Sequence, residues 1–151
     1  MFAPLLFEPI RLPVLDTYRC EAGETEADVC SRHLGYLEQA LEAHHETIAA
    51  MIIEPQLQCA AGMVTHPRGY LRGVRELTAK YDVLLIADEV AVGFGRTGTM
   101  FACEQEHVSP DLLCLGKGLT GGYLPVAATL PTYEIYRAFL GTYAESKTFY
   151  H

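Results

Sequence analysis

Short apolar runs alternate along this chain with longer stretches in which apolar residues recur every three or four positions. Such spacing between Leu34 and Ile48 predicts an amphipathic helix. A second predicted helix opens at Pro67, because proline is favoured at the first helical position. A third is expected to begin at Thr132, a good N-cap, with Glu134 in its positive first turn.

Four apolar runs are short enough to be strands, namely residues 49–53, 83–87, 112–115 and 125–130. The first run stops at Glu54-Pro55, where proline forbids continuation of a central strand. The second reads VLLIA without polar alternation, which predicts a parallel strand buried on both faces. Strands that alternate with helices indicate an α/β fold with a mostly parallel sheet.

Composition restricts the class of protein. The 151 residues are 50% hydrophobic and 20% charged, as in one globular domain, and the net charge of -8 argues against nucleic acid as a partner. The apolar N-terminus is interrupted by three prolines, so neither a signal sequence nor a membrane span is expected there. Five cysteines without CxxC spacing favour reduced thiols in the cytoplasm and no zinc site.

Three charged residues follow the predicted strands, and ligands of open α/β sheets gather at the carboxyl ends of strands. They are Glu54, Asp88 and Lys117. A lysine between two glycines has a long reach, and a desolvated amine is nucleophilic. The set suits pyridoxal phosphate, with Lys117 holding the aldehyde as a Schiff base and Asp88 keeping the ring nitrogen protonated. Alternatively, Lys117 is a solvated turn residue, Asp88 a cap and Glu54 a partner of the loop backbone.

Two nucleotide-binding motifs fit poorly. Residues 93–98 match GxGxxG, but the first glycine lies five residues after Asp88, and Asp111 precedes the next strand instead of ending it. Lys117 is followed by Gly118, and no GxxxxGK[ST] occurs in the chain. Neither phosphate cradle is therefore expected.

Several motifs resemble, in order and spacing, the class III pyridoxal-phosphate-dependent aminotransferases of fold type I. They are Ile53-Glu54-Pro55, LIADEV at 85–90, GFGRTG at 93–98, Pro110-Asp111 and GKGL at 116–119. The resemblance implies Lys117 as the catalytic Schiff-base lysine, Asp88 against the pyridine nitrogen and Val90 on a ring face. It implies Glu54 just outside the site, a homodimer, and a small-molecule amino donor and keto acceptor.

Within the family, further segments resemble most closely the branch that aminates 7-keto-8-aminopelargonate to 7,8-diaminopelargonate in biotin synthesis, with S-adenosylmethionine or lysine as donor. They are Gln58 with Gly62-Met63, and residues 101–104, 119–125 and 147–151. Cys59, Ala61 and Val92 depart from that pattern and leave the substrate open. Alternatives are a class III enzyme for an ω-amino acid, ornithine or a related amine, and an inactive fragment or non-catalytic scaffold.

The resemblance also bears on domain organisation. The family's phosphate cup, ring-stacking aromatic, downstream threonine and substrate-binding arginine have no counterpart in the chain. We therefore expect residues 1–151 to be an incomplete part of the pyridoxal-phosphate-binding large domain, cut at Lys147–His151, without the N-terminal segment and the small C-terminal domain. Little activity is expected from this chain alone.

Overall fold

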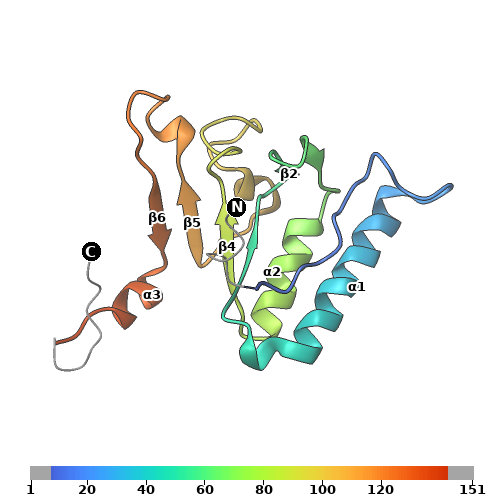
Figure 1. Cartoon of the computed structure of the whole chain (residues 1–151), viewed down its shortest axis with the longest axis horizontal. Helices are drawn as coiled ribbons and strands as arrows, with labels where there is room; N and C mark the ends of the chain where they lie inside the picture. The colour runs from blue at the N-terminus through green and yellow to red at the C-terminus, as the bar shows by residue number, and fades with distance from the viewer. Residues whose placement is uncertain (1–7, 143–151) are drawn as a thin grey trace.

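A four-stranded sheet organises the protein in a computed structural model that describes residues 8–142 (Figure 1). Its order is β1-β4-β5-β6, formed by Ala50–Ile53, Leu84–Asp88, Leu112–Leu115 and Ala128–Pro131. The first three strands run parallel, whereas β6 runs antiparallel to β5. The connection from β5 to β6 contains only a short 3-10 turn, and without a crossover helix the chain returns in the opposite direction.

Two helices pack together beside the sheet: α1, Glu26–His44, and α2, Tyr70–Lys80 (Figure 1). Their buried positions form one core with residues of β1 and β4, including Leu41, Leu71, Val74, Ile53 and Leu85. The apolar period between Leu34 and Ile48 therefore predicted a true helix. Its end differs, because α1 stops at His44 and the single 3-10 turn η2, His45–Thr47, follows.

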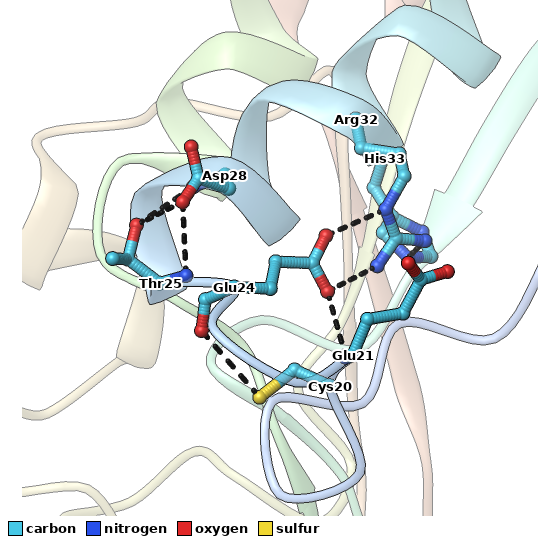
Figure 2. A network of polar contacts seen from close by, with 7 residues as sticks. All are labelled: Cys20, Glu21, Glu24, Thr25, Asp28, Arg32 and His33. Carbon is cyan, nitrogen blue, oxygen red and sulfur yellow. Dashed lines mark hydrogen bonds and ion pairs between the residues drawn. The ribbon is translucent and has the colours of Figure 1, made fainter.

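The helix α1 begins eight residues before the apolar period because a capping box starts it. Thr25 Oγ1 accepts a hydrogen bond from the Asp28 N–H at 3.3 Å, and the Asp28 carboxylate accepts the Thr25 N–H at 2.9 Å (Figure 2). Acidic residues in the first turn suit the positive end of the helix. A polar first turn shows no hydrophobic period, which explains the missed boundary.

The prediction that β4 is buried on both faces is wrong for the described residues. Leu85 and Ala87 are fully buried, but Leu84, on the opposite face, is 39% exposed. On the same face of the neighbouring strand β1, Ile52 is 64% exposed. The helices α1 and α2 cover the first face only, so the apolar residues of the second remain uncovered.

Smaller elements complete the fold. The expected loop at 56–66 contains an antiparallel hairpin of β2, Leu57–Gln58, and β3, Val64–Thr65. The 3-10 turns η3, Ala102–Glu106, and η4, Lys117–Leu119, were not predicted, whereas α3, Tyr133–Ala138, begins after Thr132 as expected. Residues 1–7 and 143–151 lie outside the described part, and with them the expected cut at 147–151. Within residues 8–142, no helix is long and apolar enough to cross a membrane.

Two histidines, His33 and His66, have lowered pKa values. Arg32 donates two hydrogen bonds to the Glu24 carboxylate, at 2.8 and 2.9 Å. Its guanidinium also lies 3.4 Å from His33 Nε2 (Figure 2). Burial, and secondarily the Arg32 charge, lowers the pKa of His33. Burial also lowers the pKa of His66, which packs edge-on against Tyr70, to about 4. Both histidines are therefore neutral in the folded protein at pH 7.

We expect the His66 environment to make the protein less stable in mild acid. In the unfolded chain His66 binds a proton below about pH 6.5, whereas in the folded protein it does so only near pH 4. The free energy of unfolding therefore falls as pH falls through this window. The loss between pH 7 and pH 5 is roughly 1–2 kcal/mol. Urea unfolding at both pH values measures it, and His66→Phe should remove most of it.

His44→Gln is the matched control, because His44 is exposed at the end of α1. It should lose as much stability between pH 7 and pH 5 as the unsubstituted protein does. An equal loss in His66→Phe would show that another group causes the acid sensitivity.

Candidate active site

The three charged residues predicted from the sequence lie at one edge of the sheet. Glu54 follows β1, Asp88 ends β4 and Lys117 lies two residues beyond β5. The strands are parallel and their ends are level, since Ile53 pairs with Ala87 and Asp88 with Cys114. The carboxyl edge of the sheet therefore carries all three, as predicted.

Lys117 has an unusual backbone. Its φ is +40°, in the left-handed region of backbone conformation that residues other than glycine rarely adopt. A Cβ at Gly116 would lie 3.2 Å from Val90 Cγ1, and a Cβ at Gly118 would lie 2.8 Å from Phe94 Cδ2. Close approach requires glycine at position 118 and leaves little room for a side chain at position 116, and the turn is held between Val90 and Phe94. Such strain costs about 1–3 kcal/mol and persists where surrounding contacts impose it.

An open pocket of about 440 Å³ lies at this turn. Lys117 and Val90 line it together with Thr120, Leu124 and Ala127, among others. The lining residues are mainly apolar apart from Lys117 and Thr120, and the Thr120 hydroxyl donates to the Leu124 carbonyl at 2.8 Å. The pocket therefore combines a lysine with an apolar wall.

Asp88 stands next to the pocket without lining it. Its Oδ1 accepts the Val90 N–H at 3.0 Å, so the carboxylate does cap the following turn. Within residues 8–142, Oδ2 receives no hydrogen bond. Val90 connects the two features, because its N–H binds Asp88 while its side chain packs on Gly116 and lines the pocket.

Glu54 supports a loop beside the turn. Its Oε2 accepts the Cys59 N–H at 3.0 Å, which confirms the alternative that it bonds the loop backbone. Burial, and then the Glu54 carboxylate, raises the pKa of the Cys59 thiol, while the positive charges of Lys117 and Arg96 act in the opposite direction. Glu54, Cys59 and Lys117 therefore share one neighbourhood, with Glu54 outside the pocket lining.

Sequence reasoning missed Phe94 and Thr120. Phe94 belongs to the glycine-rich motif at residues 93–98, which was considered as a nucleotide motif and as a family motif without a role for the phenylalanine, and its contact with Gly118 is a tertiary one. Thr120 follows the lysine turn closely enough to have been considered. The flanking glycines were the available signal, because close approach is a common reason for glycine beside a functional residue.

The family model for class III aminotransferases matches residues 1–150. The chain belongs to the class III aminotransferase family. Two curated relatives are both adenosylmethionine-8-amino-7-oxononanoate aminotransferases. The protein of Aquifex aeolicus is 56% identical over 99% of this chain, and that of Nitratidesulfovibrio vulgaris is 53% identical over all of it.

Solved structures support the same family. An omega transaminase of Pseudomonas jessenii in complex with PMP is 41% identical, with a TM-score of 0.78 over 83% of this chain and 28% of that one. A thermostable omega transaminase of Thermomicrobium roseum is 40% identical, with a TM-score of 0.81 over 87% of this chain and 30% of that one. These likenesses confirm the fold-type I architecture expected for a class III aminotransferase.

This class III aminotransferase chain is much shorter than the relatives it matches. It spans 33% of the Aquifex aeolicus protein and 28% of the Nitratidesulfovibrio vulgaris protein. The site described above therefore corresponds to one part of those proteins.

Proposed function

We propose that this chain acts within a longer polypeptide, here called the complete protein, that is a pyridoxal-phosphate-dependent aminotransferase. The chain is its central part of the large domain, joined to an N-terminal segment and a small C-terminal domain. The observation that carries the proposal is the Lys117 turn, held between Val90 and Phe94 in an open pocket beside Asp88. Family membership supplies the reaction type.

The residues present fit the cofactor. The Lys117 turn offers a primary amine to an open pocket, Val90 gives that pocket an apolar wall, and Asp88 has one carboxylate oxygen without a protein donor within residues 8–142. Pyridoxal phosphate needs these three kinds of group: an amine for its aldehyde, a surface for its ring and an anion for its ring nitrogen. When bound, it withdraws electrons from the substrate α-carbon.

The chain's own residues then have separate tasks. Lys117 would bind the cofactor through its Nζ, and the free amine would move the proton between the substrate α-carbon and the cofactor. Asp88 would keep the ring nitrogen protonated, and Val90, which packs on Gly116, would orient the ring. Glu54 keeps the Cys59 loop in place through the Cys59 N–H.

The substrate class follows from the relatives. Identities of 53–56% to adenosylmethionine-8-amino-7-oxononanoate aminotransferases support amination of 7-keto-8-aminopelargonate, with S-adenosylmethionine or lysine as donor. The departure at Val92 weighs little against this, because Val92 is fully buried and does not line the pocket. We also propose a homodimer in the cytoplasm that needs neither nucleic acid nor a membrane.

A second candidate is a class III aminotransferase for an ω-amino acid, ornithine or a related amine, favoured by the structural likeness to omega transaminases at 40–41% identity. Turnover by the complete protein separates the two candidates. We expect 7,8-diaminopelargonate to form from 7-keto-8-aminopelargonate with S-adenosylmethionine or lysine, and only weak transfer from an ω-amine to pyruvate. The reverse ranking would establish the second candidate, and no transfer in either assay would favour a non-catalytic scaffold.

A further inference from the structure

Glu89 is a buried carboxylate for which the proposed reaction has no use. It follows Asp88 at the end of β4, and the side chain is 0% exposed. Its Oε2 accepts the Ala102 N–H at 2.7 Å and its Oε1 accepts the Cys103 N–H at 2.8 Å. Its backbone carbonyl accepts the Gly93 N–H at 2.9 Å. One residue thus ties together both ends of the glycine-rich loop at residues 93–101.

The 93–101 loop packs against the Lys117 turn. A Cβ at Gly118 would meet three atoms of Phe94, at 2.8, 2.9 and 3.1 Å, so the phenylalanine lies directly against the glycine backbone. The Phe94 ring packs edge-on against the Phe101 ring, with the ring centroids 5.8 Å apart. The loop therefore transmits the position of its anchored ends to the residue next to Lys117.

The second support of the lysine turn also starts at Glu89. Val90, the next residue, packs on Gly116 on the other side of Lys117. The segment from Glu89 to Phe94 thus reaches both glycines that flank the lysine. Because Lys117 holds a φ of +40°, contacts on both sides are what keep the turn in this rare conformation.

Another buried carboxylate provides an internal comparison. Glu106, 8% exposed, lies at the far end of η3 and accepts the Gly69 N–H at 2.9 Å and the Arg72 N–H at 2.8 Å. It has the same chemistry as Glu89, a carboxylate on two backbone donors, but it ties η3 to the start of α2. Removing either carboxylate should weaken the fold, but of the two only Glu89 anchors the loop whose Phe94 contacts Gly118 in the Lys117 turn.

We propose that Glu89 is a positioning residue for Lys117, acting through the 93–101 loop and its Phe94 contact. It does not line the pocket, so it acts on the amine through the backbone. The inference deepens the proposed function, because it matters for catalysis only if Lys117 carries the cofactor. A glutamine at this position retains the shape but turns an NH₂ group toward a backbone N–H, which leaves one buried donor unpaired.

Hydrogen exchange in the complete protein without cofactor tests the inference. Glu89→Gln should accelerate amide exchange by about fivefold, the effect of one lost hydrogen bond, in the 93–101 loop, at Ala102 and Cys103, and in the 116–120 turn. The turn is a usable reporter because its amides are bonded, with Leu119 N–H to the Gly116 carbonyl at 2.9 Å. Glu106→Gln should accelerate exchange at α2 and η3 and leave the 116–120 turn unchanged.

Two results would overturn the inference: faster exchange of the loop alone in Glu89→Gln, or equal acceleration of the turn by Glu106→Gln. If Glu89→Gln does not fold, Phe94→Ala decides, since it removes the Gly118 contact and leaves the carboxylate bonds. It should accelerate exchange at 116–120 but not at 102–103, and an unchanged turn would reject the inference.

A second readout links the inference to function. Glu89→Gln should slow the covalent attachment of pyridoxal phosphate to Lys117, trapped with borohydride, more than Glu106→Gln does. Equal rates in the two variants would reject a role in positioning the amine. If neither the variants nor the unsubstituted protein attach the cofactor, the proposed function is wrong. The hydrogen-exchange result then still tests whether Glu89 positions the Lys117 turn.

Discussion

Replacing Lys117 with alanine in the complete protein should lower kcat for transamination by at least about a thousandfold. In the proposed function, the substitution removes both the amine that binds the cofactor and the group that moves the proton at the substrate α-carbon, and loss of a positioned acid–base group alone costs roughly 10²–10⁴-fold. The fold should survive, because Lys117 is exposed and the turn is held by its flanking glycines. Steady-state turnover and thermal unfolding of the same preparation measure the two effects.

Lys80→Ala is the control for loss of a lysine. Lys80 lies at the end of α2 and pairs with Glu38 at 2.7 Å on the surface, with 57% of its side chain exposed. Exposed pairs contribute little to stability, and Lys80 is not part of the pocket lining. Lys80→Ala should retain nearly full turnover, and a Lys117→Ala protein within tenfold of normal activity would remove Lys117 from the mechanism.

Asp88→Asn should lower kcat by roughly 10²–10³-fold while leaving stability almost unchanged, the range found when one preorganised electrostatic partner is removed. Asparagine keeps the side-chain oxygen that accepts the Val90 N–H, so the local cap remains. Only the negative charge disappears. Steady-state kinetics with thermal unfolding therefore separates the two roles that the sequence left open, because a residue that serves only as a cap would tolerate this change.

Asp82→Asn gives the matched control. Asp82 lies just before β4, is exposed, and has a φ of +55°, a backbone conformation that asparagine also tolerates. The same charge is lost at the opposite end of the strand. Equal activity losses in the two variants would point to a nonspecific charge effect, and an unimpaired Asp88→Asn enzyme would leave Asp88 as a cap alone.

The parts of the fold that depend on local pattern were predictable. Apolar runs located β1, β4 and β5, and the polar residues that follow them gave Glu54, Asp88 and Lys117 at the carboxyl edge. The class III aminotransferase resemblance added Val90, which lines the pocket with Lys117, while its contact with a cofactor ring stays a prediction. These predictions depend on strand ends and motif spacing, which a single sequence contains.

The remainder depends on contacts between distant residues. The antiparallel direction of β6 follows from a connection without a helix, and the uncovered face of β4 follows from where α1 and α2 pack. In the sequence Glu89 was only one letter of the motif at residues 85–90, because its partners Ala102 and Cys103 come close to it only in the fold. Its effect on the lysine turn could not be predicted from spacing.

Covalent trapping tests the central claim most directly. The complete protein is incubated with pyridoxal phosphate, reduced with borohydride, digested and mapped by mass spectrometry. Our account predicts one stoichiometric adduct, on the peptide that contains Lys117, and its loss when free cofactor is replaced by buffer. An adduct at another lysine, or none in a folded protein, would contradict the assignment of Lys117 as the cofactor-binding residue.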